Sequence, residues 1–80
     1  MKVAVDISLY PLDADYVPPI DDFIARLHAH QQIRVETHAM STQVSGDLAA
    51  VMGALEQEMA RTFSGELRSV FVLKVFGGGG

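Results

Sequence analysis

Residues 33–46 read IRVETHAMSTQVSG, and this stretch decides the fold because it holds two strands in direct succession. Apolar, β-branched or small side chains at the odd positions of residues 33–39 alternate with polar side chains and one methionine at the even positions, as in a half-buried strand. Residues 42–46 suggest a second strand. The join at Met40-Ser41 lacks the Asn-Gly or Asp-Gly pair of a tight hairpin turn, so we expect an irregular hairpin or a bulge there.

A helix is expected before this pair of strands. Pro18-Pro19 suits its start, because the first turn of a helix tolerates proline. Asp21 and Asp22 are expected in that first turn, where their charge favours the positive end of the helix dipole. Apolar residues at i, i+3, i+4 and i+7 form one helical stripe that ends near His30, and they are Ile20, Phe23, Ile24 and Leu27.

A longer helix is expected after the pair. Asp47 follows Gly46 and is a suitable N-cap residue, and Ser64-Gly65 ends the helix. We interpret Glu56, Glu58 and Arg61 as its solvated face. Its apolar residues give the strongest periodicity in the chain, and they are Leu48, Val51, Met52, Leu55, Met59 and Phe63.

One further strand is expected at each end of the chain. Residues 2–10 alternate, with Val3, Val5, Ile7 and Leu9 on one side, and Pro11 ends the strand because it cannot donate to a ladder. Residues 69–76 are nearly all apolar and are interrupted by Lys74. Because both of its faces are apolar, we expect this last strand to be central in the sheet or in an interface rather than at an exposed edge.

The order β-α-β-β-α-β predicts a ferredoxin-like α+β sandwich, in which two helices cover one face of a four-stranded antiparallel sheet. We expect one domain over residues 1–76 and a flexible glycine tail over residues 77–80. The other face of the sheet has no cover from its own chain. A second sheet packed on it would cover its apolar residues, and a polar ligand held between the sheets would satisfy its polar ones. The residues expected on it are Asp6, Ser8, Tyr10, Arg34, Glu36, His38, Gln43, Ser45, Val70, Val72 and Lys74.

Composition excludes several classes of function. The chain has 80 residues and no cysteine, which rules out a disulfide, a cysteine-ligated zinc and a thiol nucleophile. A net charge of −4 with 6 Lys+Arg argues against a nucleic-acid partner. Neither a signal-peptide core nor the roughly 20 apolar residues of a membrane span is present, so we expect a cytoplasmic protein with no membrane partner.

Three segments resemble the small thiamine-binding, YkoF-like protein family, formerly a domain of unknown function. They are ISLYPL at 7–12, ETHAMSTQV at 36–44 and VFVLKV at 70–75. The resemblance extends over residues 2–76 and implies a ferredoxin-like fold whose sheets associate into homodimers or homotetramers. It also implies binding of thiamine or its hydroxymethylpyrimidine half by a carrier or sensor that is not an enzyme and needs no cofactor.

Glu36 is the first candidate for contact with such a ligand. A carboxylate can accept a hydrogen bond from the exocyclic amine of an aminopyrimidine. The alternative is that Glu36 pairs with Arg34, Lys74 or His38 on the same sheet face.

The other candidates are each ordinary strand or core residues as well. Tyr10 could stack on an aromatic ring, and Met40 could form an adaptable pocket wall. The residues that could donate or accept further hydrogen bonds are Ser8, His38, Thr42 and Gln43.

Neither a catalytic nor a metal site is expected. His28 and His30 are two positions apart on a helix, which places them about 200° apart around its axis. His38 and Glu36 are only two ligands, whereas zinc prefers at least three from the protein. Two functions stay open: a non-catalytic small-molecule binding protein, and an oligomeric assembly module without a thiamine-type ligand.

Overall fold

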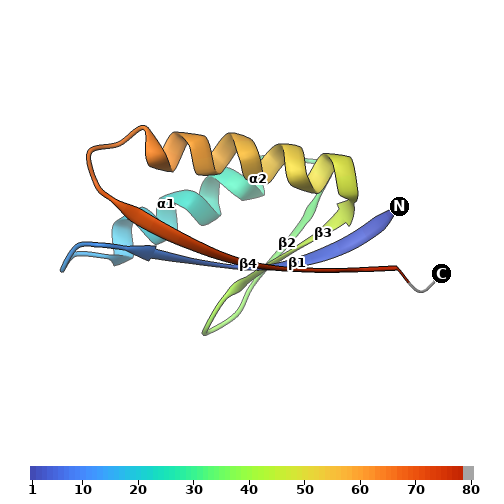
Figure 1. Ribbon diagram of the computed structural model, residues 1–80, viewed down its shortest axis with the longest axis horizontal. Coiled ribbons are helices and arrows are strands. Elements are labelled where there is room, and N and C mark those ends of the chain that lie inside the picture. The colour runs from blue at the N-terminus through green and yellow to red at the C-terminus, as the bar shows by residue number, and fades with distance from the viewer. Residues whose placement is uncertain (79–80) are drawn as a thin grey trace.

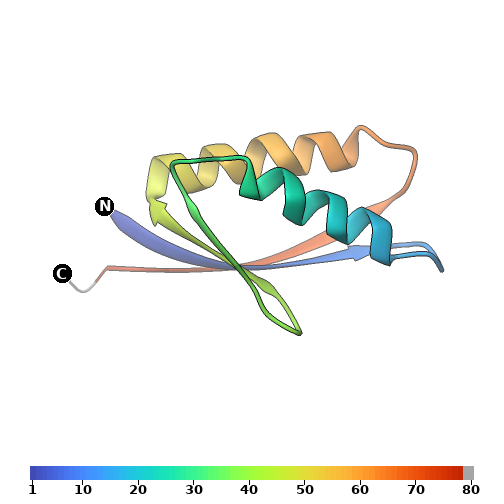
Figure 2. The same ribbon diagram turned by 180° about the vertical axis from the view of Figure 1, so that it is seen from behind.

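The computed structural model describes residues 1–78 and contains the six elements in the predicted order. They are β1 (Lys2–Pro11), α1 (Val17–His28), β2 (Arg34–Thr37), β3 (Thr42–Asp47), α2 (Leu48–Phe63) and β4 (Ser69–Gly77). Both helices lie on the same side of the sheet, as Figures 1 and 2 show. The predicted ferredoxin-like α+β sandwich is therefore confirmed.

The sheet is antiparallel throughout and has the strand order β2-β3-β1-β4. At its centre Val5 of β1 lies between Val44 of β3 and Val75 of β4. β4 is an edge strand, so the first expected position, the centre of the sheet, was wrong, whereas the second, an interface, stays a prediction. Its apolar outward residues are thus left without cover from the described part of the chain.

The hydrophobic core lies between the sheet and the two helices. The predicted inward face of β1 is confirmed, because Val3, Val5, Ile7 and Leu9 are all buried. They pack against the buried helix residues Phe23, Leu27, Val51 and Leu55. The ring of Phe71 in β4 extends this core, with its centroid 4.9 Å from that of Phe23 and 5.3 Å from that of Phe63.

The predicted phase of α2 was partly wrong. Leu48, Met52 and Phe63 are a third to a half exposed, whereas Glu58 is 1% exposed. Glu58 is therefore not on the solvated face, because it lies seven residues after the buried Val51 and shares its side of the helix.

The expected first-turn position of two aspartates was wrong, and the expected N-cap position of a third was confirmed without a capping hydrogen bond. α1 begins at Val17, so Asp21 and Asp22 lie in its second turn rather than its first. Asp22 Oδ2 accepts a hydrogen bond from Arg26 Nε at 3.0 Å, one turn further along. Asp47 occupies the N-cap position of α2 without a capping hydrogen bond from its side chain. Its carboxylate instead accepts from the Met1 amino group at 3.3 Å, and this bond lowers the pKa of Asp47.

The strand ends differ from the predicted ones in the hairpin and at the C-terminus. β2 stops at Thr37, because His38 already donates its backbone N–H to the Ser41 carbonyl at 2.8 Å and closes the turn. Among the described residues only glycines have positive φ, so the turn is not a tight type I′ or II′ turn and the expected irregular hairpin is confirmed. Gly77 pairs with Val3 and belongs to β4, so the predicted tail does not begin at 77. The last two positions of that tail, 79–80, lie outside the described residues.

Among residues 1–78, no helix is long and apolar enough to cross a membrane.

Candidate functional site

A hollow of about 710 Å³ lies where the β2–β3 hairpin separates from β1. β1 pairs with β3 only as far as Ile7 opposite Thr42, but it pairs with β4 as far as Pro11 opposite Ser69. The last four residues of β1 therefore have no strand on their β3 side within the described chain. Figures 1 and 2 show the hairpin projecting away from the helices at this point.

The walls of the hollow come from three parts of the chain: residues 7–11 of β1, residues 37–42 of the hairpin, and the start of α1 with the preceding Tyr16. Ile7 and Leu9 face the helices, whereas Ser8 and Tyr10 belong to the opposite face of β1. Residues of both faces of β1 therefore line the hollow, at the end of the strand that has no β3 partner.

Five of the seven predicted site residues line this one hollow, and they are Ser8, Tyr10, His38, Met40 and Thr42. They come from two strands and a turn that are far apart in sequence. The hollow also includes Tyr16 and Asp21, which sequence reasoning missed. Their contribution depends on how α1 is placed against the hairpin, and no spacing in the sequence reveals that placement.

Glu36 and Gln43 do not line the hollow. They lie opposite each other on β2 and β3. Glu36 Oε1 is 2.7 Å from Arg34 Nη2, and Glu36 Oε2 is 3.8 Å from His38 Nε2. The structure thus contains the ion pair that was the alternative reading of Glu36.

Polar groups with spare hydrogen-bonding capacity face the hollow. Thr42 is only 6% exposed, and no described side chain or backbone group bonds to its hydroxyl, yet that oxygen is not sealed from solvent. Thr42 is one of the residues that line the hollow. Ser8 Oγ donates to the Met40 carbonyl over a long 3.5 Å, which leaves it available for a better partner.

The backbone of β1 adds a donor and an acceptor. Leu12 N–H donates to the Arg68 carbonyl at 2.9 Å, so the even-numbered residues of β1 direct their backbone groups toward β4. The N–H and C=O of Leu9 consequently point to the other side, into the gap left by the hairpin. An edge of this kind can bind a planar ligand that carries both a donor and an acceptor.

Apolar side chains complete the hollow. Ile7, Leu9, Ile20 and Phe23 line it on the core side. Tyr10 and Tyr16 are each 54% exposed and also belong to its lining. The combination of an apolar floor, accessible aromatic rings and a few polar groups is typical of a site for a small organic molecule.

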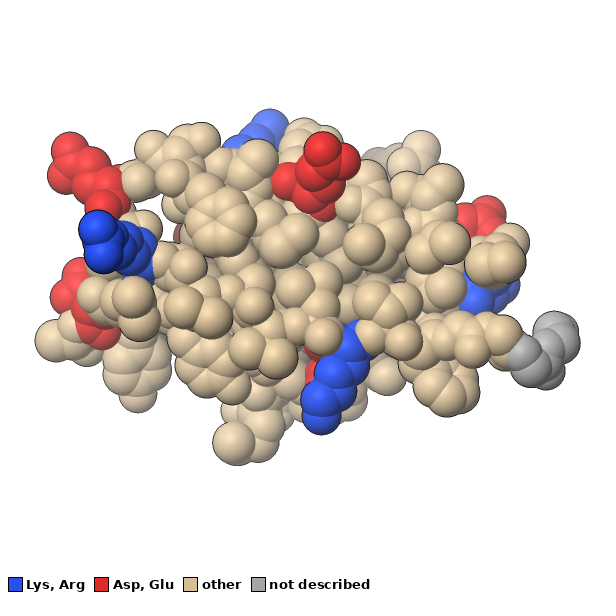
Figure 3. Space-filling model, in the orientation of Figure 1, with Lys and Arg blue, Asp and Glu red and all other residues tan. Residues whose placement is uncertain are grey.

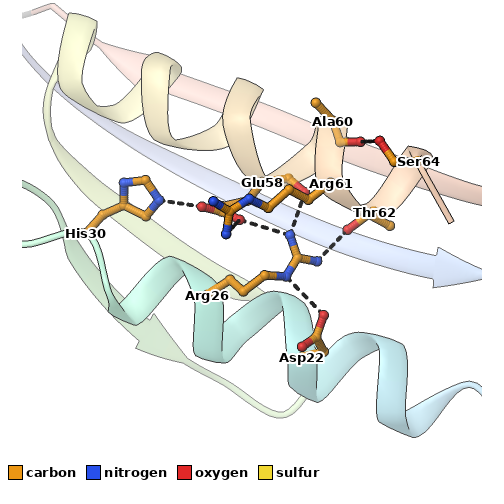
Figure 4. A network of polar contacts seen from close by, with 8 residues as sticks. All are labelled: Asp22, Arg26, His30, Glu58, Ala60, Arg61, Thr62 and Ser64. Carbon is orange, nitrogen blue, oxygen red and sulfur yellow. Dashed lines mark hydrogen bonds and ion pairs between the residues drawn. The ribbon is translucent and has the colours of Figure 1, made fainter.

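A second polar cluster lies between the helices and was not predicted (Figure 4). Arg26 Nη1 donates to Glu58 Oε1 at 2.9 Å, and His30 Nε2 lies 2.6 Å from Glu58 Oε2. Arg26 Nη2 donates to Thr62 Oγ1 at 2.8 Å. None of these residues lines the large hollow, so the cluster joins α1 to α2 rather than forming part of the site.

Burial and charge act in opposite directions on the pKa of Glu58. Burial raises it, but hydrogen bonds from His30 and Arg26 and the charges of Arg61 and Arg26 outweigh burial and hold it below its ordinary value. The spacing Val51, Leu55, Glu58 was the signal in the sequence, because it places Glu58 on the buried stripe.

The uncovered side of the sheet carries apolar residues in a row along β4. Val70, Val72 and Phe76 are 46%, 48% and 77% exposed. Figure 3 views the molecule from the β4 edge of the sheet, and most of the visible surface is free of charged residues. Within residues 1–78, no three His, Asp or Glu side chains gather in a way that could hold a metal ion.

Solved structures share this fold over nearly the whole chain. A hypothetical protein from Methanocaldococcus jannaschii is 26% identical with a TM-score of 0.84, and the match covers 98% of this chain and 81% of that one. A candidate thiamine biosynthesis/salvage protein from Thermotoga maritima is 21% identical with a TM-score of 0.84, covering 98% and 85%. A protein from Streptococcus pneumoniae is 20% identical with a TM-score of 0.87, covering 99% and 89%.

A search of curated protein sequences finds no match. The model of the YKOF-related family matches residues 2–66, which include two of the three segments on which the resemblance was based. The third segment, 70–75, lies outside that match. The match spans well over half of the chain, and the chain therefore belongs to the YKOF-related family.

Proposed function

We propose that this protein binds thiamine or its hydroxymethylpyrimidine moiety in the hollow beside β1, without catalysing a reaction. The observation that carries the proposal is that five residues selected for such a ligand line one hollow. Membership of the YKOF-related family supports it, as does a structural neighbour described as a candidate thiamine biosynthesis/salvage protein.

The aminopyrimidine half fits the gap in the sheet. Its ring nitrogens accept hydrogen bonds and its exocyclic amine donates them. The free N–H and C=O of Leu9 and the hydroxyls of Ser8 and Thr42 offer complementary groups at the same place. The accessible rings of Tyr10 and Tyr16 supply stacking surfaces for a planar ligand.

The test is thermal unfolding with and without thiamine and hydroxymethylpyrimidine at fixed protein concentration. A ligand at 100 times its dissociation constant stabilises the folded state by about 2.7 kcal/mol. For a chain of this length that corresponds to a rise in Tm of roughly 10 °C or more. If neither compound raises Tm at millimolar concentration, the proposal is refuted.

Three variants locate the ligand. Thr42→Val removes the unpartnered hydroxyl and keeps the shape of the side chain, so it should weaken binding several-fold with little effect on the apo protein. Ser45→Ala, on the same strand but outside the hollow, is the matched control. Glu36→Gln should leave binding in the hollow unchanged. If Glu36→Gln weakens binding and Thr42→Val does not, the ligand lies on the open sheet face instead.

The uncovered sheet supports a second candidate function, that of a homodimeric or homotetrameric assembly module. The exposed residues Val70, Val72 and Phe76 are too apolar to be left in water at no cost. Burial of this row against a second copy would also bring two hollows close to one interface, because Tyr10 lies opposite Val70 in the register. A sedimentation experiment that finds only monomer at micromolar concentration would exclude this function.

A further inference from the structure

Charge is distributed unevenly around the hollow. None of the described residues that line it is lysine or arginine, and its one carboxylate is Asp21. Asp21 has no ion-pair partner among the described residues, unlike its neighbour Asp22, which pairs with Arg26. His38 also lines the hollow, and its Nε2 is 3.8 Å from a carboxylate oxygen of Glu36. The hollow therefore offers an anionic group to a ligand and no permanent cation.

The start of α1 borders the hollow, and such a helix end ordinarily attracts anions. Its first four backbone N–H groups lack partners within the helix, and the dipole adds positive potential. Here Pro18 and Pro19 occupy the first turn and have no N–H, which leaves only those of Tyr16 and Val17. Two of the four N–H donors of this helix end are thus missing, and Tyr16 and Ile20 on either side of them line the hollow.

Two aromatic rings line the same hollow as this carboxylate. Tyr10 and Tyr16 both line the hollow and are both half-exposed. The face of a tyrosine ring attracts a cation, and the attraction grows as water is excluded. The two tyrosine rings and the Asp21 carboxylate together favour a flat ligand that carries a positive charge.

We propose that the hollow accepts its ligand as an unphosphorylated aromatic cation, with Asp21 as the counter-charge, and excludes phosphate esters of the same ligand. The inference rests on the proposed function. Thiamine has a permanently charged thiazolium ring and fits the class. Its monophosphate adds a group of about −1.5 to −2 charge at neutral pH, which would meet Asp21 in a hollow that no described lysine or arginine lines. The protein would then act before a phosphoryl-transfer step on the ligand or after hydrolysis of its phosphate ester.

The test compares the affinities of thiamine and thiamine monophosphate by titration calorimetry at pH 7.5 and low salt. The wild-type protein should bind thiamine at least about tenfold more tightly, since attraction by Asp21 is replaced by repulsion. Asp21→Asn should reduce this ratio several-fold. Asp22→Asn removes the same formal charge one residue away, outside the hollow, and should leave the ratio as in wild type.

A double variant, Pro18→Ala with Pro19→Ala, restores two backbone donors and should tighten binding of the monophosphate by severalfold. This variant replaces both prolines with alanine, the residue with the highest helix propensity, so loss of folding is not expected. Equal affinity of the wild type for both compounds would overturn the inference and leave the proposed function standing. A ratio of thiamine to thiamine monophosphate affinity that is unchanged in Asp21→Asn would also overturn the inference and leave the proposed function standing. If wild-type protein binds neither compound, the inference fails, and the proposed function fails with it only if hydroxymethylpyrimidine also leaves Tm unchanged.

Discussion

Replacing Glu58 by glutamine measures how much the ion pairs between the helices contribute to stability. Glu58 is 1% exposed and receives two charge-assisted contacts, from Arg26 at 2.9 Å and from His30 at 2.6 Å. A hydrogen bond to a charged group contributes about 1.5–3 kcal/mol, roughly twice the value of a neutral one. Glutamine keeps the shape and one neutral acceptor, so we expect a loss of about 2 kcal/mol in the free energy of unfolding.

The assay is thermal unfolding followed by circular dichroism at one fixed protein concentration. A loss of 2 kcal/mol corresponds to a fall in Tm of roughly 8–16 °C for a domain of this size. Glu56→Gln, two residues away on the exposed side of α2, is the matched control and should change stability by less than about 0.5 kcal/mol. Equal stability of Glu58→Gln and wild type would refute the view that the buried charge is compensated by its partners.

Three further predictions follow from particular contacts. The pKa of Glu58 is lowered on folding, so the contribution of this carboxylate to the free energy of unfolding is complete above its ordinary pKa of 4.5 and is lost as pH falls through the folded pKa. The stability difference between wild type and Glu58→Gln should therefore shrink in acid unfolding curves below pH 4.5. Gly46 has φ +148°, and an added Cβ would lie 3.3 Å from the Gln32 carbonyl, so Gly46→Ala should lower the free energy of unfolding by about 1–2 kcal/mol. A Cβ added at Gly53 on α2 would lie in open space, so Gly53→Ala should raise the free energy of unfolding by about 0.5–1 kcal/mol. Equal effects of the two substitutions in denaturant titrations would contradict this. Val72→Asp should cost the single chain little, because Val72 is 48% exposed, but should dissociate any oligomer built on this face, and an intact oligomer in sedimentation would exclude the face from the interface.

The strand faces were predictable because they depend on local alternation. The four inward residues of β1 were assigned correctly, since burial on one side of a sheet imposes a period of two. The residues that face inward on the helices were less predictable. Glu58 was assigned to solvent because of its charge, and only the position of Arg26 on the neighbouring helix shows why a carboxylate can be buried there.

The site depends on features that have no local signature. Ser8, Tyr10 and Thr42 could be selected as ligand contacts from chemistry and resemblance, but the hollow exists because β2 ends at Thr37 and the hairpin then leaves β1. Asp21 lines the hollow through the placement of α1, which starts at Val17, before the prolines rather than at them. A shift of one residue in a helix start is below what propensity can predict.

Both tyrosines of the chain line the hollow, and the chain has no tryptophan. Its intrinsic ultraviolet fluorescence therefore originates almost entirely from the rings of Tyr10 and Tyr16, on the surface where a ligand would stack. Occupancy can be read as quenching of this emission without any label, and Tyr10→Phe and Tyr16→Phe would divide the signal between the two positions.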